Sequence, residues 1–263
     1  MSAEFEYCPQ CGQKANLHRF SLHEIFHEFL HAFTHADKGL FFLVKELALH
    51  PGRVAAEYVE GKRKKYYNPF SFLLICAAIF VFSNKIFHSF ERNPQLQKLA
   101  QIQQALKNNA SGFTPAQVKN LKMASRAMEA QHFVSANTNI LQLIATPLIA
   151  FIAWLFFRYK KQRNYAEILV ADCFFAGFSA LFFVVIISPL MALAGNNNIL
   201  YFSFLIAGLI FQVTYFGVAY HTFFGFNSKL AYGRTILASL VAVIVWTLLS
   251  SMLMLLYIKG FFL

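Results

Sequence analysis

The sequence has few charged residues, and few of those are acidic. Charged residues make up 13% of the 263-residue chain, whereas soluble domains typically carry about 25%. Only 12 residues are acidic against 23 Lys and Arg, so the formal net charge is +11. Hydrophobic residues reach 57%, 32 of them Phe, and the mean hydropathy is +0.48. Long stretches without any charge exclude an ordinary soluble domain and predict an integral membrane protein.

The signatures of several common protein classes are also absent. The chain contains no glycine-rich phosphate loop, no serine nucleophile elbow and no pair of catalytic carboxylates. Residues 1–20 lack an apolar central region, so we predict no cleavable signal peptide. The positive charge is not attached to any nucleic-acid-binding module. We therefore expect no nucleic-acid partner and no enzymatic activity, and we interpret the basic residues as flanks of membrane spans that face anionic lipid head groups.

Five apolar runs are each close to the length that one bilayer crossing needs. They cover about 68–87, 140–159, 168–194, 199–224 and 235–258. Nine Lys and Arg precede Tyr66, the Arg158–Arg163 loop has four, and Lys229 and Arg234 follow the fourth run, whereas the Gly195–Asn198 turn has none. The positive-inside rule then predicts five crossings of the cytoplasmic membrane, with a cytosolic N-terminus and an extracytoplasmic C-terminus.

The predicted fold class is all-α, an integral membrane five-helix bundle over residues 67–263. Residues 1–66 form a cytosolic N-terminal segment with amphipathic helices at about 21–35, 40–49 and 53–60. Residues 89–139 read as an extracytoplasmic helical hairpin, because two amphipathic stretches are joined at Ser111–Gly112.

Two overlapping HExxH patterns lie in the first of these helices. Two His four residues apart on a helix can bind one zinc ion, and the Glu between them can serve as a general base. Alternatively, the same side chains face water or lipid phosphate from a helix at the membrane surface. The metal hypothesis uses His23, His27, His31 and Asp37 as ligands, with Glu24 and Glu28 as candidate bases of a metallopeptidase.

A CxxC pair near the N-terminus, Cys8 and Cys11, resembles half of a zinc ribbon. A second CxxC is missing from the sequence, and His18 with His23 could complete the set. The alternative is an empty remnant of such a site. A disulfide is not expected, because the predicted topology places these thiols in the reducing cytosol. Zinc is the one cofactor that the sequence suggests.

A basic cluster lies directly before the first apolar run. Lys62–Lys65 precede the aromatic pair Tyr66–Tyr67 and then Pro69, which is typical of a chain passing from a basic surface through the head-group layer into hydrocarbon. We predict a surface that binds lipid or a protein partner, built from Arg53, Lys62, Arg63, Lys64, Lys65 and Tyr66.

Polar residues inside the apolar runs are few. Asp172 is the one carboxylate well inside a run, and an acid at that depth is a functional candidate because burying its charge is costly. His221 lies at a similar depth, so the two side chains could pair, and Gln212 is a further polar group. A small-solute transporter would use Asp172 and His221. The alternative is an interhelical hydrogen bond that holds the bundle together.

Several motifs resemble a bacterial family of membrane proteins that is catalogued only as a domain of unknown function. They are Cys8-Pro-Gln-Cys11-Gly12, Pro51-Gly52-Arg53 and the stretch from Glu57-Tyr58 through Gly61-Lys62-Arg63 to Pro69, and the likeness extends over about 8–85. More loosely, five spans behind a cytosolic segment are similar to the Yip1-type proteins, which are linked to membrane organisation. The resemblance implies a bacterial membrane location and a docking role for the 51–69 stretch. Our functional hypothesis is a non-enzymatic membrane-organising or interaction protein, which acts with a protein partner or as a homo-oligomer.

Overall fold

The computed structural model describes residues 39–87, 138–158, 163–195 and 197–258, together with positions 104, 123, 126, 127 and 130. Throughout this part of the chain the regular structure is helical and contains no strand, which confirms the all-α prediction. The predicted helix at 21–35 and nearly all of the predicted hairpin at 89–139 lie outside the described residues.

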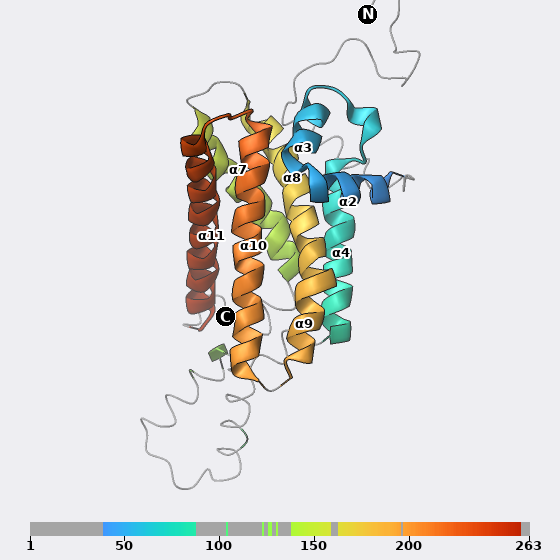
Figure 1. The fold of residues 1–263 in the computed structure, drawn as a ribbon. Helices are drawn as coiled ribbons and strands as arrows, with labels where there is room; N and C mark the ends of the chain where they lie inside the picture. Colours follow the sequence, from blue (N-terminus) through green and yellow to red (C-terminus); the bar gives the residue numbers. More distant parts are fainter. Residues whose placement is uncertain are drawn as a thin grey trace, which may run out of the picture.

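Five long helices stand side by side and alternate in direction (Figure 1). The central helix of the bundle is α8, which packs against α4, α7 and α10, while α11 packs against α10 and α7. Their bounds are α4 (Pro69–Phe87), α7 (Thr138–Phe157), α8 (Tyr165–Phe182), α10 (Asn198–Phe223) and α11 (Lys229–Ile258).

Four helical stretches are long and apolar enough to cross a membrane, which indicates a multi-pass membrane protein. They are Arg63–Ser83, Tyr165–Leu193, Asn198–Phe223 and Lys229–Met252. The stretch Leu141–Phe157 of α7 is apolar but shorter than these four. Length and composition therefore support four crossings, and a fifth crossing through α7 stays a prediction.

Two helices, α8 and α11, begin earlier than the apolar runs that predicted them, because polar residues cap these helices. Asn164 forms a capping box with Glu167 at the start of α8: its side-chain oxygen accepts from the Glu167 backbone N–H at 2.8 Å, and the Glu167 carboxylate accepts from the Asn164 N–H at 2.9 Å. Ser228 Oγ accepts from the Ala231 N–H at 3.1 Å at the start of α11. Apolar runs mark where hydrocarbon contact begins, whereas helices begin at their caps.

The helix predicted over 168–194 is not regular along its whole length. A π-helical turn, η3 (Phe183–Ile187), separates α8 from α9 (Ser188–Leu193). Pro189 has no backbone N–H to donate to the preceding turn, which explains a local change in hydrogen bonding at this point. Gly208 of α10 faces this turn, where a Cβ would lie 3.4 Å from Ile187. A Cβ at this position would make only ordinary van der Waals contact, so the π-helical turn packs against α10 without requiring glycine there.

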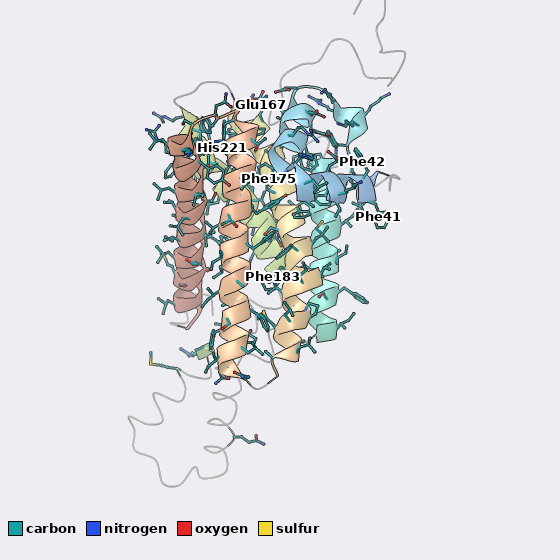
Figure 2. The ribbon with its side chains drawn as sticks, viewed as in Figure 1. Phe41, Phe42, Glu167, Phe175, Phe183 and His221 are labelled. Carbon is teal, nitrogen blue, oxygen red and sulfur yellow. The ribbon has the colours of Figure 1, made fainter. Side chains whose placement is uncertain are left out.

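Two short helices precede α4 and pack against the upper half of the bundle in the view of Figure 1. They are α2 (Leu40–Leu49), which lies across the bundle's long axis, and α3 (Pro51–Val59). They match the predictions at 40–49 and 53–60, except that Pro51 occupies the first turn of α3. Leu43 and Leu47 of α2 are fully buried, whereas Phe41 is 87% exposed and directed away from the bundle (Figure 2). The exposed side of α2 therefore carries large apolar side chains, Phe41, Phe42 and Leu49, besides Lys45.

A glycine lets α3 lie directly against the backbone of α10. A Cβ on Gly52 would come within 2.5 Å of the Thr222 Cβ and within 2.6 Å of the Phe223 backbone nitrogen. Because real Cβ atoms essentially never approach other heavy atoms this closely, only glycine fits at this contact. The Pro51-Gly52 pair thus starts α3 and docks it on α10.

Candidate functional site

Most charged residues of the described helices lie at one end of the bundle, whereas Lys85, in the last turn of α4, lies at the other end and Asp172 lies in the interior. The N-terminal ends of α4, α8 and α11 and the C-terminal ends of α7 and α10 lie together there (Figure 1). At the opposite end, the described residues of the turn between α9 and α10 carry no charge. The first end, which we term the charged end, includes Arg53, Lys62, Arg63, Lys64, Lys65, Arg158, Arg163, Lys229 and Arg234.

A tight turn brings the basic cluster back over α3. Gly61, with φ +112°, follows the helix and reverses the chain direction. The Gly61 N–H donates to the Tyr58 carbonyl at 3.2 Å, and the Lys62 N–H donates to the Glu57 carbonyl at 2.9 Å. These two bonds have the connectivity of a Schellman motif, in which glycine at the position after the helix is strongly favoured. The short 3₁₀ helix η1 (Arg63–Lys65) then places its side chains beside the last turns of α3.

Three side chains of this folded-back segment contact the Glu57 carboxylate. Lys65 Nζ donates to Oε2 at 2.7 Å, the Tyr66 hydroxyl donates to the same oxygen at 2.8 Å, and Lys62 Nζ lies 3.2 Å from Oε1. We call these four residues the Glu57 cluster. Contacts with Lys65 first, and then with Tyr66 and Lys62, hold the pKa of Glu57 down to about 2, against the opposing effect of burial.

Within the Glu57 cluster the acid lies beneath its bases. The Glu57 side chain is 18% exposed, whereas the side chains of Lys62 and Lys65 are 60% and 43% exposed. A molecule approaching the charged end therefore meets ammonium groups before it meets the carboxylate. One carboxylate balances one of the two positive charges, so the pair of lysines keeps a net positive charge.

The other two acids of the 39–66 segment are also paired with bases. Glu46 accepts from Arg53 at 3.2 Å and lies 4.0 Å from His50 Nδ1. Glu60, at the end of α3, accepts from Arg163 Nη2 at 2.6 Å. Arg163 belongs to the turn before α8, so this last ion pair joins α3 to the main bundle.

The predicted lipid-binding residues fall into two groups. Arg53, Lys62 and Lys65 are exposed and paired with the acids just described, and Lys64 is exposed while Arg63 is half-buried. Tyr66 is only 5% exposed and stacks on Phe42 with ring centroids 6.0 Å apart. Tyr66 therefore orients Glu57 from the interior, while the lysines and arginines supply the surface. Glu57, Glu60 and Arg163 are not among the site residues predicted from the sequence, although Gly61 after a helix is a signal that the chain folds back.

Asp172 is bonded to Tyr220 in the interior of the bundle. The Tyr220 hydroxyl on α10 donates to Asp172 Oδ1 on α8 at 2.7 Å. Asp172 is fully buried, and its Oδ2 has no hydrogen-bond partner among the described residues. His221, the candidate partner from the sequence, instead packs against the rings of Tyr232 and Phe226, with centroids 4.9 Å and 6.1 Å away. Tyr220, the residue next to His221 on α10, is therefore the partner of Asp172.

The remaining predicted site residues are placed as follows. Gln212 is partly buried and lines a small void with Ser239 and Ala242 between α10 and α11. Within the described ranges, no three His, Cys, Asp or Glu side chains come together to hold a metal ion. Nine residues of the zinc and peptidase hypotheses lie outside those ranges: Cys8, Cys11, His18, His23, Glu24, His27, Glu28, His31 and Asp37.

Residues 37–81 match a family described as "Protein of unknown function (DUF3667)". The matched range contains α2, α3, η1 and most of α4, and it includes the whole Glu57 cluster. It supports the predicted relationship to an uncharacterised domain family. No curated protein and no solved structure matches the chain.

Proposed function

We propose that this chain is a non-enzymatic organiser of the bacterial cytoplasmic membrane, which binds anionic lipid head groups at its charged end. In this proposal the chain crosses the membrane five times, with α7 as the fifth crossing, and the N-terminus is cytosolic and the C-terminus extracytoplasmic. The gathering of Lys and Arg at one end of the bundle supports this orientation, because such residues are retained on the cytosolic side. The same charges attract the anionic lipids of the cytosolic leaflet.

The observation that carries the proposal is the layering of charge in the Glu57 cluster. Lys62 and Lys65 are held next to each other by one carboxylate beneath them, and both ammonium groups stay exposed. Two ammonium groups fixed side by side can donate hydrogen bonds to the oxygens of one phosphate, and less side-chain entropy is lost on binding than with two free lysines. The candidate span Arg63–Ser83 begins at the Glu57 cluster, so in this proposal the cluster lies at the depth of the head groups.

A protein partner or a second copy of the chain is the other binding partner that this proposal includes. The match over 37–81 covers the Glu57 cluster and the docked α2–α3 pair, which together form the surface that such a partner would contact. Zinc binding by the N-terminal Cys and His residues stays a prediction from the sequence.

Lipid titration of the purified full-length protein tests this proposal. The variant carries Lys62→Gln and Lys65→Gln together with Glu57→Gln, so that no carboxylate is left without its bases. We expect this triple variant to bind phosphatidylglycerol about tenfold more weakly in detergent, as measured by the lipid adducts in native mass spectrometry, because two charge-assisted hydrogen bonds are lost.

A matched control removes the same net charge elsewhere at the charged end. Arg234→Gln lowers the net charge by one, as the triple variant does, but leaves the Glu57 cluster intact. Equal weakening by the control and the triple variant would mean that net charge alone attracts the lipid. Unchanged binding by the triple variant would overturn the proposal.

A further inference from the structure

A second site lies on the charged end, away from the Glu57 cluster. It is an open cleft of about 460 Å³ between the last turn of α3, the turn before α8 and the last turn of α10. This volume is within the range of small-molecule sites, roughly 300–1,000 Å³. Its lining residues are Ala56, Glu60, Arg163, Thr222, Phe223, Phe224 and Gly225.

The cleft carries one positive and one negative side chain that are already next to each other. Arg163 Nη2 donates to Glu60 Oε1 at 2.6 Å, and the guanidinium group lies 5.1 Å from the centre of the Phe223 ring. The Arg163 side chain is 16% exposed and the Glu60 side chain 56% exposed, so the cation is deeper than the carboxylate. Neither side chain has a second hydrogen bond within the described ranges. A guanidinium group has five N–H donors, which leaves several for a ligand.

The ends of two helices add partial negative charge to the cleft. The C-terminal ends of α3 and α10 both border it, at Glu60 and Phe224. Helix C-termini carry partial negative charge and favour cations. The mouth of the cleft therefore suits an ammonium group, while Arg163 at its base suits a phosphate.

The position of the cleft relative to the membrane limits what can enter it. Candidate span Asn198–Phe223 ends at the cleft and candidate span Tyr165–Leu193 begins beside it. With these spans crossing the bilayer as in the proposed function, the cleft lies at the level of lipid head groups. We propose that it binds the head group of an aminophospholipid, with Arg163 taking the phosphate and Glu60 taking the primary ammonium group. The ion pair holds opposite charges side by side, as a phosphate and an amine joined by a two-carbon link require.

Lipids that differ only in the head group test this proposal. The full-length protein in detergent is titrated with phosphatidylethanolamine and phosphatidylcholine of identical acyl chains, and adducts are counted by native mass spectrometry. We expect about tenfold tighter binding of phosphatidylethanolamine, because a trimethylammonium group has no N–H to donate to Glu60. Equal binding of the two lipids would overturn the proposal.

A pair of double variants assigns the preference to the cleft. Glu60→Gln with Arg163→Gln removes both charges and is expected to abolish the preference for phosphatidylethanolamine. Glu46→Gln with Arg53→Gln removes an ion pair of the same kind outside the cleft and is expected to keep it. Because the preference is a ratio, it does not depend on how much folded protein each sample contains. A preference that survives in the first double variant would overturn the proposal.

Competition with soluble phosphoethanolamine distinguishes binding of a lipid from binding of a free metabolite with the same head group. We expect it to compete only weakly, because it lacks the acyl chains that anchor a lipid in the bilayer. Competition at the concentration at which the lipid itself binds would overturn the lipid assignment. These measurements do not use phosphatidylglycerol or the Glu57 cluster, so they can fail while the proposed function stands, and the reverse also holds.

Discussion

The Tyr220 hydroxyl on α10 donates a 2.7 Å hydrogen bond to Asp172 on α8, in a place where neither side chain reaches solvent. The aromatic rings of Phe157 and Phe175 flank Tyr220, with centroids 6.1 Å and 5.7 Å away. Apart from this bond, the carboxyl group has no hydrogen-bond partner within the described ranges. Among the described residues, a single side-chain contact therefore holds the Asp172 carboxyl group, and its Oδ2 has no hydrogen-bond partner.

Removal of that contact is expected to destabilise the bundle. Tyr220→Phe leaves the buried carboxyl group of Asp172 without its donor, which typically costs about 1–3 kcal/mol. We expect a lower unfolding temperature in detergent for this variant. Tyr232→Phe is the control, because the Tyr232 hydroxyl makes no hydrogen bond within the described ranges and the residue is partly exposed. Equal unfolding temperatures for wild type and Tyr220→Phe would contradict this prediction.

Two glycine substitutions should shift stability in opposite directions. Gly52→Ala places a Cβ within 2.6 Å of the α10 backbone and is expected to cost about 1–3 kcal/mol through overpacking. Gly233→Ala, inside α11 with open space around it, is expected to stabilise the protein by about 0.5–1 kcal/mol, because alanine favours the helix. Thermal unfolding of both variants in the same detergent measures the difference. A neutral Gly52→Ala variant would show that α3 is not docked tightly on α10.

The Glu57 cluster should make stability depend on pH in acid. The pKa of Glu57 is about 2 in the folded protein and 4.5 for an unperturbed group, so its contribution is fully present above pH 4.5 and is lost as the pH falls towards 2. We expect the difference in unfolding temperature between wild type and Glu57→Gln to be largest near neutral pH and to shrink below pH 4.5. Carboxylates common to both proteins cancel in this comparison. A difference that stays constant from pH 7 to pH 3 would refute the prediction.

The orientation of the bundle can be measured with single cysteines. Cys8 and Cys11 are first replaced by Ser, and Cys76 and Cys173 are buried. A membrane-impermeant maleimide applied to intact cells is expected to label Asn197→Cys but to label Lys64→Cys only after permeabilisation. The same two cysteines check whether α7 is a fifth crossing: crossings by α4, α7 and α8 place Lys64 and Asn197 on opposite sides, whereas α4 and α8 alone would place them on the same side. Labelling of both cysteines from outside would rule out the proposed orientation.

The positions of the long helices followed from the sequence because lipid requires uninterrupted apolar runs. All five predicted runs coincide with helices, and the errors at the starts of α8 and α11 come from caps that the runs do not contain. The partners of individual polar residues did not follow in the same way. By depth alone Asp172 could pair with His221 or make another interhelical hydrogen bond. A helix turns about 100° per residue, so Tyr220 and His221 face different neighbours, and Tyr220 makes the bond.

The sequence by itself determined that this protein is all-helical, that most of its helices are apolar enough for a membrane and that its charges lie in a few short segments. Those properties depend on local composition and on helical spacing, which any contiguous stretch reveals. Only the tertiary structure decided that Lys62 and Lys65 cover Glu57, that Arg163 reaches Glu60 and that Gly52 docks α3 on α10. Those contacts depend on the reversal at Gly61 and on packing between helices far apart in the chain, which residue order alone does not specify.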